Sequence, residues 1–340
     1  MADGGRPADG RRPADSGSPL APFLDLDRGH IRFSVRPPPE PGPLAHVDGL
    51  LAGAAEADLT PPPGMPKAGY SRLAHTGSGF RTRLRARVVH LRAGRTSLAL
   101  VACDLHVGSA VLQHLVSRAV AEDTDVGLAG LFIGVTHTHG GPGGFHDSQF
   151  YAHWSADRPG FDPAYTHFLV ERIAGAVIAA VGSRRPARLA AGSDQVWGVS
   201  RNRAHAPHVR NHTVADKRTD PQRKWVGVNP WLHLLRIDTE EAGGAVRPLA
   251  AWVTYSIHGV AVSEQTPDYN GDLWPHLCDE LAGRVAASHG SRPIVAAAQG
   301  THGDVTPAVR PGLKTHPEAE RLGRRIGAAA ADVYRDLDGE

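Results

Sequence analysis

The chain has 340 residues, enough for one large domain or two small ones with a substantial buried core. Its apolar fraction of 41% and charged fraction of 21% are typical of soluble globular proteins. A formal charge of +2 excludes the strongly basic surface that nucleic-acid binding requires, so no nucleic-acid partner is expected. Its 20 histidines stand out, because imidazole is the commonest metal ligand in proteins.

The first 48 residues are expected to form a disordered tail in front of a single domain at residues 49–340. The tail repeats RPADG as RPADS and contains the run Pro37-Pro38-Pro39. Such a segment buries too little apolar surface to offset its ordering entropy. Residues 1–18 lack the apolar stretch of a signal peptide, so a cytoplasmic location is the default, and a misassigned start codon would leave secretion open.

Strand and helix patterns alternate along the rest of the chain. Strands are expected at residues 84–91, 97–105, 131–136, 188–191, 231–237, 249–257 and 294–298, and helices at 110–121, from 163 through 177, at 273–287 and at 318–337. This alternation predicts an α/β fold, a mixed β-sheet with packed helices. The apolar run at 174–181 is too short to span a membrane, so no integral membrane segment is expected. Cys103 and Cys278 lie in apolar stretches and are expected to be buried thiols.

The sharpest chemical signal is GVTHTHGGPGG at residues 134–144, directly after an expected strand. Residues two apart in an extended segment point the same way, so His137 and His139 can face one pocket. Strand ends that lead into glycine-rich loops are where α/β sheets bind ligands. Two hydrogen-bonded turn histidines are the alternative, but this position favours metal or substrate binding.

Three further motifs are weaker when taken singly. His258 ends an apolar strand in YSIHG, and together with His137 it predicts a second zinc ligand, since metal ligands commonly come from distant strand ends. The loop AQGTHGDVTP carries the Thr306 hydroxyl, which could bind substrate or act as a nucleophile, or could simply belong to an Asp-anchored turn. In the segment SRNR, Arg203 could stabilise developing negative charge or be an ordinary solvated arginine.

In this order the motifs resemble the neutral/alkaline non-lysosomal ceramidase family. Its members carry a THTHSGPGG-like loop, an Asn-Arg segment, a Val-His-Gly or Val-His-Pro turn and a Gly-Asp-Val-Ser/Asn-Pro loop. The matching segments here are THTHGGPGG, Asn202-Arg203, SIHGV and GDVTP, and the segments EADLTP, Gly69-Tyr70 and NPWLHLLRID also resemble the family. The likeness extends over roughly residues 52–310.

The resemblance implies zinc-dependent hydrolysis of the amide bond of ceramide or a related N-acyl lipid, giving a fatty acid and an amine. It implies that Zn²⁺ is held by His137 and His258, and that His139 contacts the substrate or the tetrahedral intermediate. Asn202, Arg203 and Thr306 would bind the polar head, with His139, Arg203 and Thr306 as the catalytic residues. The implied partner is a small-molecule lipid amide. Peripheral contact with lipid is compatible with this partner, and the oligomeric state is left open.

The chain departs from the family pattern at two points. Thr306 stands where serine is usual, which keeps the hydroxyl but adds a methyl group and restricts χ1. The family's remaining zinc ligands, a glutamate and a tyrosine, lie well beyond this loop, so the domain is expected to be incomplete at its C-terminus and to bind zinc weakly. His139, His302 and Asp304 are the local residues that could substitute.

Other classes of protein remain as alternatives. A metallo-β-lactamase needs an Asp-His pair after its His-x-His, where this chain has Gly140, Gly141 and Pro142. Amidohydrolase barrels need a later series of Lys, His, His and Asp that this sequence does not arrange. A zinc hydrolase with a different substrate is a further alternative, as is a non-catalytic relative or fragment with an incomplete metal site. Zinc content would separate the catalytic from the non-catalytic reading.

Overall fold

The computed structural model describes residues 33–241 and 243–338, so residues 1–32 of the expected tail lie outside the described part. The main sheet contains β1 (Val47–Asp58), β3 (Arg85–Gly94), β4 (Thr96–Cys103), β5 (Leu131–Val135), β6 (Arg185–Gln195), β8 (Trp231–Glu240), β9 (Val246–Tyr255) and β11 (Ile294–Gln299). The main helices are α2 (Ala110–Val120), α4 (Pro163–Gly182), α6 (Trp274–His289) and α7 (His316–Asp336).

Short elements complete the chain. Strand β2 (Gly79–Phe80) pairs with β10 (Asp268–Tyr269), and β7 (Ser200–Asn202) pairs with β12 (Val305–Pro307). The short helices are α3 (Gln149–Trp154) and α5 (His205–His208), with 3-10 turns η2 (Ser71–Leu73), η3 (Leu128–Gly130) and η4 (Pro221–Trp225).

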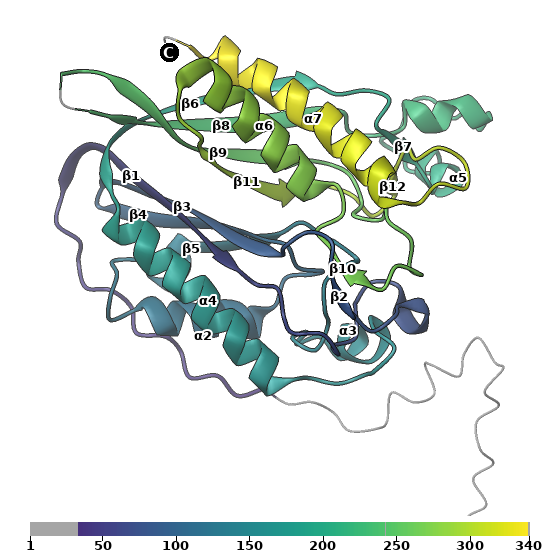
Figure 1. The fold of residues 1–340 in the computed structure, drawn as a ribbon, viewed down its shortest axis with the longest axis horizontal. Coiled ribbons are helices and arrows are strands. Elements are labelled where there is room, and N and C mark those ends of the chain that lie inside the picture. Colours follow the sequence, from purple (N-terminus) through teal and green to yellow (C-terminus); the bar gives the residue numbers. More distant parts are fainter. Residues whose placement is uncertain (1–32, 242, 339–340) are drawn as a thin grey trace, which may run out of the picture.

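The eight-stranded sheet has the order β11-β9-β8-β6-β1-β3-β4-β5 and folds over on itself. Helices α6 and α7 cover one half of the sheet, and α2 and α4 cover the other (Figure 1). The result is a helix–sheet–sheet–helix sandwich. Strands β4 and β5 are parallel, as are β9 and β11, while the other neighbours are antiparallel. The expected α/β fold with a mixed sheet and packed helices is confirmed.

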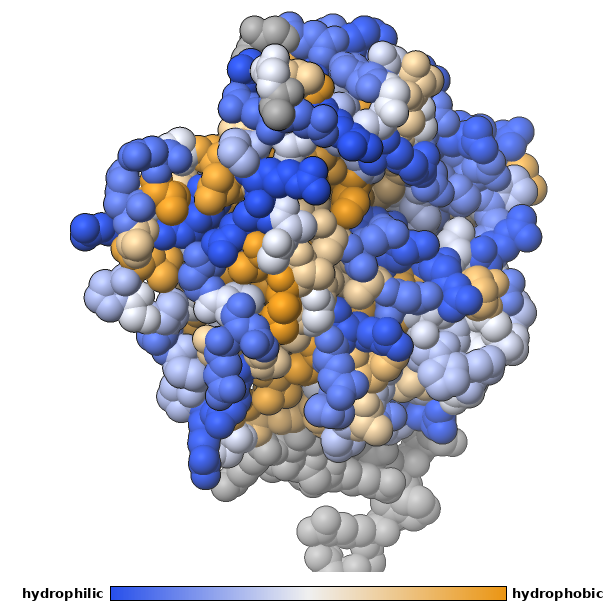
Figure 2. Space-filling model, turned by 60° about the vertical axis from the view of Figure 1, so that its left-hand side comes forward, coloured by the Kyte–Doolittle hydropathy of each residue, from blue (hydrophilic) through white to orange (hydrophobic). Residues whose placement is uncertain are grey.

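Small side chains fill the layer between the two half-sheets. Ala52, Ala102, Ala250 and Ala296 are all buried there, and Trp252 is the largest member of the cluster. Only two residue pairs join β1 to β6, where one half of the sheet continues into the other. The two halves therefore lie face to face and are held mainly by this apolar layer. Figure 2 shows a face of the molecule on which apolar residues form a band between hydrophilic flanks.

The expectation of no membrane-spanning segment stays a prediction. Among the described residues, one helix, α4, is long and apolar enough to cross a membrane by length and composition. The uninterrupted apolar run at 174–181 is only part of this helix, which begins at Pro163 and includes Glu171 and Arg172. Its apolar residues Leu169, Ile173 and Val177 are fully buried in the core, so α4 is weak evidence for a span.

The N-terminal part of the described chain also packs on the domain. Residues 33–46 form no helix or strand, yet Pro38 is buried and Arg92 donates a hydrogen bond to the Ala45 carbonyl. The ring of Phe33 lies 4.8 Å from that of Phe161. Strand β1, which no sequence pattern predicts, begins at Val47. Cys103 and Cys278 are free and buried, as expected.

Candidate metal centre

The loops that follow β4, β5 and β9 carry a group of buried histidines, and the loop after β11 adds the partly buried His302. His137 and His139 follow β5, His258 follows β9, and the three Nε2 atoms form a triangle. The Nε2–Nε2 distances are 3.1 Å between His137 and His258, 3.1 Å between His258 and His139, and 3.3 Å between His139 and His137. The structure thus brings together the two predicted zinc ligands and the predicted substrate contact, from segments about 120 residues apart.

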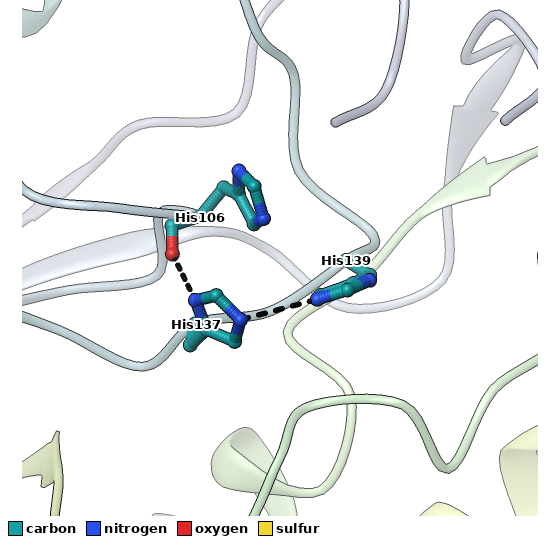
Figure 3. Close-up of side chains that lie close together, drawn as sticks. All are labelled: His106, His137 and His139. Atoms are coloured by element: carbon teal, nitrogen blue, oxygen red, sulfur yellow. Dashed lines mark hydrogen bonds between the residues drawn. The ribbon is translucent and has the colours of Figure 1, made fainter. Parts of the chain in front are cut away.

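The other ring nitrogen of two of these histidines is fixed by a backbone carbonyl. The Nδ1–H of His137 donates to the His106 carbonyl oxygen at 2.6 Å (Figure 3), and that of His258 donates to the His302 carbonyl oxygen at 3.1 Å. A proton held on Nδ1 leaves the Nε2 lone pair free and aims it into the triangle. Histidines that bind metals are oriented by this kind of hydrogen bond.

The backbone at the centre is under local strain. His137 has a φ of +54°, a left-handed conformation that is uncommon outside glycine and clusters at functional sites. Thr138 pairs with Gly259, and a Cβ at Gly259 would lie 2.5 Å from the His137 carbonyl oxygen. Glycine at 259 therefore allows the two histidine-bearing segments to approach each other closely enough for the triangle to form.

Burial holds these imidazoles in the neutral form. Desolvation lowers the pKa of His137 from 6.5 to about 3 and that of His258 to about 4, and the nearby histidines lower both pKa values further. The pKa of His139 is also well below its usual range, because the ring is buried beside other histidines. A neutral imidazole can donate its lone pair to a cation, so the donor set suits a metal of the zinc type.

Two further histidines border the triangle. The ring of His106 stacks on His137 with centroids 4.8 Å apart, and the ring of His302 lies 4.2 Å from His137. Each belongs to a trio with ligand atoms mutually within 4.8 Å: His106 with His137 and His139, and His302 with His137 and His258. Sequence reasoning noted His302 but missed His106. Its position shortly after the apolar strand β4 was the available signal.

Three of the four predicted substrate-contacting residues, Asn202, Arg203 and Thr306, lie on the paired strands β7 and β12 or directly beside them. Arg203 is exposed, and its guanidinium donates to the Gly303 carbonyl oxygen at 2.9 and 3.1 Å. Its positive charge contributes to the low pKa values of the triangle histidines, which places it near the centre. Thr306 pairs with Arg201, and its neighbour Val305 accepts a hydrogen bond from the His258 backbone.

The Asn202 side chain makes hydrogen bonds to its own loop and to two segments distant in the sequence. Its Nδ2 donates to the Gly227 carbonyl oxygen at 2.7 Å and to Asp304 at 2.8 Å, and its Oδ1 accepts from the Ala204 backbone. The side chain is 1% exposed. These contacts position the loop that carries Arg203, whereas a direct substrate contact of Asn202 stays a prediction.

Two residues beside His139 were not expected from the sequence. The ring of Tyr70 meets His139 edge-on with centroids 4.7 Å apart, and its hydroxyl donates to the Val262 carbonyl oxygen at 2.7 Å. Asp272 is buried and accepts from the backbone of Val262 and Leu273, and burial raises its pKa to about 6. Both side chains stabilise the loops that form the wall of the metal centre beside His139.

A groove of about 640 Å³ lies next to this wall, and Ser263 lines both the groove and the wall. Its lining combines basic side chains, such as Arg201 and Lys314, with the apolar side chains of Trp225 and Leu313. The groove can therefore contact a molecule that is partly polar and partly apolar.

Fold and site together define an α/β protein with a buried histidine cluster of metal-binding type at the ends of its strands. The chain belongs to the neutral/alkaline non-lysosomal ceramidase family, since the family model described as "Neutral/alkaline non-lysosomal ceramidase, N-terminal" matches residues 50–319. The resemblance that the sequence motifs indicated is thereby confirmed.

Individual relatives agree with this assignment. The chain is 29% identical over 286 residues to a protein named neutral ceramidase from Mycobacterium tuberculosis, covering 80% of this chain and 43% of that protein. It is 25% identical to neutral ceramidase from Pseudomonas aeruginosa, covering 69% of this chain and 35% of that protein. The chain thus spans less than half the length of these relatives.

The fold is also similar to that of a solved structure. The crystal structure of neutral ceramidase from Pseudomonas aeruginosa superposes with a TM-score of 0.74 at 23% identity, over 86% of this chain and 46% of that one. This similarity supports the fold.

Proposed function

We propose that this chain forms the metal-binding part of a hydrolase that cleaves the amide bond of ceramide or a related N-acyl lipid. Family membership and the names of the relatives support the reaction class. The single observation that carries the proposal is the approach of His137 and His258, with Nε2 atoms 3.1 Å apart and both Nδ1 protons held by carbonyl oxygens. Zn²⁺ is the proposed cofactor, since its preferred donors include neutral imidazole.

The site residues of this chain would have separate roles in hydrolysis of the amide. His137 and His258 would hold zinc, which when bound supplies Lewis acidity that polarises a carbonyl and makes water nucleophilic near neutral pH. Arg203, anchored on the Gly303 carbonyl, would stabilise negative charge that develops on the substrate oxygen. The Thr306 hydroxyl would hydrogen-bond the polar head and orient it.

The groove beside the centre supports a lipid amide as the substrate. Its basic residues can contact a polar head group, while Trp225 and Leu313 offer apolar surface to a hydrocarbon chain. Trp225 and Leu313 are 40% and 43% exposed, so this rim could also rest on a lipid surface. Peripheral contact with lipid is therefore part of the proposal.

Two measurements on one preparation test the proposed function. Titration with zinc should load about one ion per chain, with the weak affinity expected of a site held by two histidines. A fluorescent N-acyl-sphingosine should be hydrolysed by the protein and not by the H137A or H258A variants. An exposed histidine of α4, replaced in H167A, serves as the matched control and should leave hydrolysis unchanged. Stoichiometric zinc without hydrolysis would reject the substrate, and no zinc would reject the centre.

A further inference from the structure

A second cavity, of about 290 Å³, lies between the two half-sheets. It shares no lining residue with the groove or with the wall of the metal centre. Its charged lining residues are Glu56, Arg85 and Arg87 from β1 and β3, and Asp279 and Arg292 from α6 and the segment before β11. Three guanidinium groups and two carboxylates surround the cavity, so its lining carries a net positive charge.

Arg87 is a buried arginine whose hydrogen bonding is incomplete. It lies two residues before Val89, on the face of β3 that contributes to the apolar layer between the half-sheets. A guanidinium has five N–H donors. Within the described chain, the Arg87 side chain makes one hydrogen bond, from Nη1 to Oδ2 of Asp104 at 3.1 Å. A buried donor without an acceptor is costly, and Arg87 lines the cavity, so its remaining donors favour a ligand there.

Asp104 compensates the charge of Arg87 without occupying the cavity. The same Oδ2 atom that accepts from Arg87 also accepts from the Arg85 backbone at 2.9 Å. Asp104 is fully buried and does not line the cavity. Burial alone would lower the pKa of Arg87, but the Asp104 carboxylate raises it above its usual value. The guanidinium therefore stays charged while most of its donors have no protein acceptor.

The other two arginines belong to exposed ion pairs. Nη1 of Arg85 lies 2.7 Å from Oε1 of Glu56, and Nη2 of Arg292 lies 2.7 Å from Oδ1 of Asp279. All four side chains are at least 37% exposed, and such pairs contribute little to stability. Each pair uses one nitrogen of its guanidinium, so both arginines keep donors for a further acceptor.

The size and donors of the cavity fit a small oxyanion. Pockets for drug-sized ligands measure about 300–1,000 Å³, so a cavity at the lower limit suits a smaller molecule. Guanidinium forks match the oxygens of carboxylates and phosphates. Three arginines suit phosphate better, because it presents more acceptor oxygens than a carboxylate. The Cys278 thiol also lines the cavity, and burial raises its pKa to about 12, so it adds no negative charge.

We propose that this cavity binds a phosphate group through Arg85, Arg87 and Arg292. The inference assigns a second site to the chain and rests neither on the metal centre nor on amide hydrolysis. Free phosphate and the phosphate of a small phosphomonoester present the same kind of oxygens to these arginines. Both are therefore compared in the test.

The test is isothermal titration of the metal-free protein with inorganic phosphate, glycerol 3-phosphate and acetate. We expect one phosphate site per chain, with acetate at least about tenfold weaker, since it forms fewer charge-assisted hydrogen bonds. The tighter of the two phosphates identifies the source of the group. Phosphate should also raise the melting temperature, because a ligand of the folded state stabilises it. Absence of saturable phosphate binding by the folded protein would overturn the proposal.

Variants locate the site. R292M should weaken phosphate binding by at least about tenfold, and so should R87K, which keeps the charge beside Asp104 but loses the planar fork. R284M is the matched control, because Arg284 is also 53% exposed and also pairs with one acid at 2.7 Å. It should stay within about threefold of wild type. Wild-type affinity in R292M would contradict the site even if R87K did not fold.

Arg203 beside the histidine triangle is the competing position for phosphate. Its guanidinium is exposed and contributes positive charge near the metal centre. R203A should keep phosphate binding within about threefold of wild type, since Arg203 does not line the cavity. Loss of binding in R203A with retention in R292M would move phosphate to the metal centre and overturn the proposal.

Discussion

His258 and His137 combine burial with fixed neutral tautomers, and this has a consequence for stability. The pKa of His258 is about 4 and that of His137 about 3 in the folded chain, against 6.5 for an exposed imidazole. As the pH falls below 6.5, the unfolded chain takes up protons that the folded chain does not. Folding stability is therefore lost as the pH falls through this window, and it is fully present above it.

We expect the free energy of unfolding of the metal-free protein to fall between pH 6.5 and about pH 4. Each such histidine contributes a slope of about 1.4 kcal/mol per pH unit within the window. Denaturant titrations at pH 7.5, 6 and 5 would measure this slope. H258Q should reduce the slope by about 1.4 kcal/mol per pH unit, which is the contribution of one histidine. A flat profile from pH 7.5 to 5 would show that these imidazoles take up protons as readily in the folded chain as in the unfolded chain.

Neighbouring residues of one loop should respond differently to truncation. Asn202 to alanine should lower the free energy of unfolding by about 1–3 kcal/mol, because the buried Asn202 side chain would no longer make its hydrogen bonds to Gly227 and Asp304. Arg203 to alanine should leave unfolding nearly unchanged, since the side chain is exposed, but should reduce amide hydrolysis. Chemical denaturation and turnover of both variants check this. Equal stability of the two variants would contradict the structural role of Asn202.

The sequence predicted which histidines approach each other but not how they are held. His-x-His at a strand end and a histidine at another strand end could be read from the pattern. The acceptors for Nδ1 are backbone carbonyls of His106 and His302, and a carbonyl carries no residue-type signal. Tyr70 and Asp272 were missed because their roles depend on packing between distant segments.

At the scale of elements, the contact between the turn after β9 and the segment after β5 determines how closely the histidines of the metal centre approach each other. We expect Gly259 to alanine to weaken zinc affinity and to lower the melting temperature, because its Cβ would meet the His137 carbonyl at 2.5 Å. Gly303 to alanine is the matched control, since open space surrounds the position of that Cβ. Thermal melts with and without zinc compare the two variants. Equal behaviour would show that the backbone at 259 can relax.

Most helices and strands were predictable, and the exceptions have a physical reason. Strands β3, β4, β5, β8, β9 and β11 and the long helices follow apolar periodicity and lie close to their expected bounds. Strand β1 has the sequence VDGLLAGAAEAD, whose alanines and glycines give little alternation. Its pairing with β3 extends from Val47 to Asp58 and depends on tertiary contacts rather than on local preference. The short pairs β2–β10 and β7–β12 were missed for the same reason.

At the scale of the whole molecule, the N-terminal segment provides a test of domain limits. The expected domain start at residue 49 lies inside strand β1, so we propose that the domain also includes residues 33–48 and that residues 1–32 are dispensable for folding. A chain that begins at residue 33 should melt at the temperature of the full chain. A chain that begins at Val47 loses buried Pro38 and the contact of Arg92 with Ala45, and should melt a few degrees lower. Calorimetry distinguishes the two, and identical melting of all three chains would show that residues 33–46 contribute nothing.

The two halves of the sheet meet laterally through only two residue pairs between β1 and β6. The histidine triangle draws His137 and His139 from one half and His258 from the other. An ion bound there would be a cross-link between half-sheets that pack through small side chains. Such a site exists only once both halves have docked in register, so occupancy would report completed assembly. Bound metal would then stabilise the docked arrangement of the two half-sheets over any state in which they have separated.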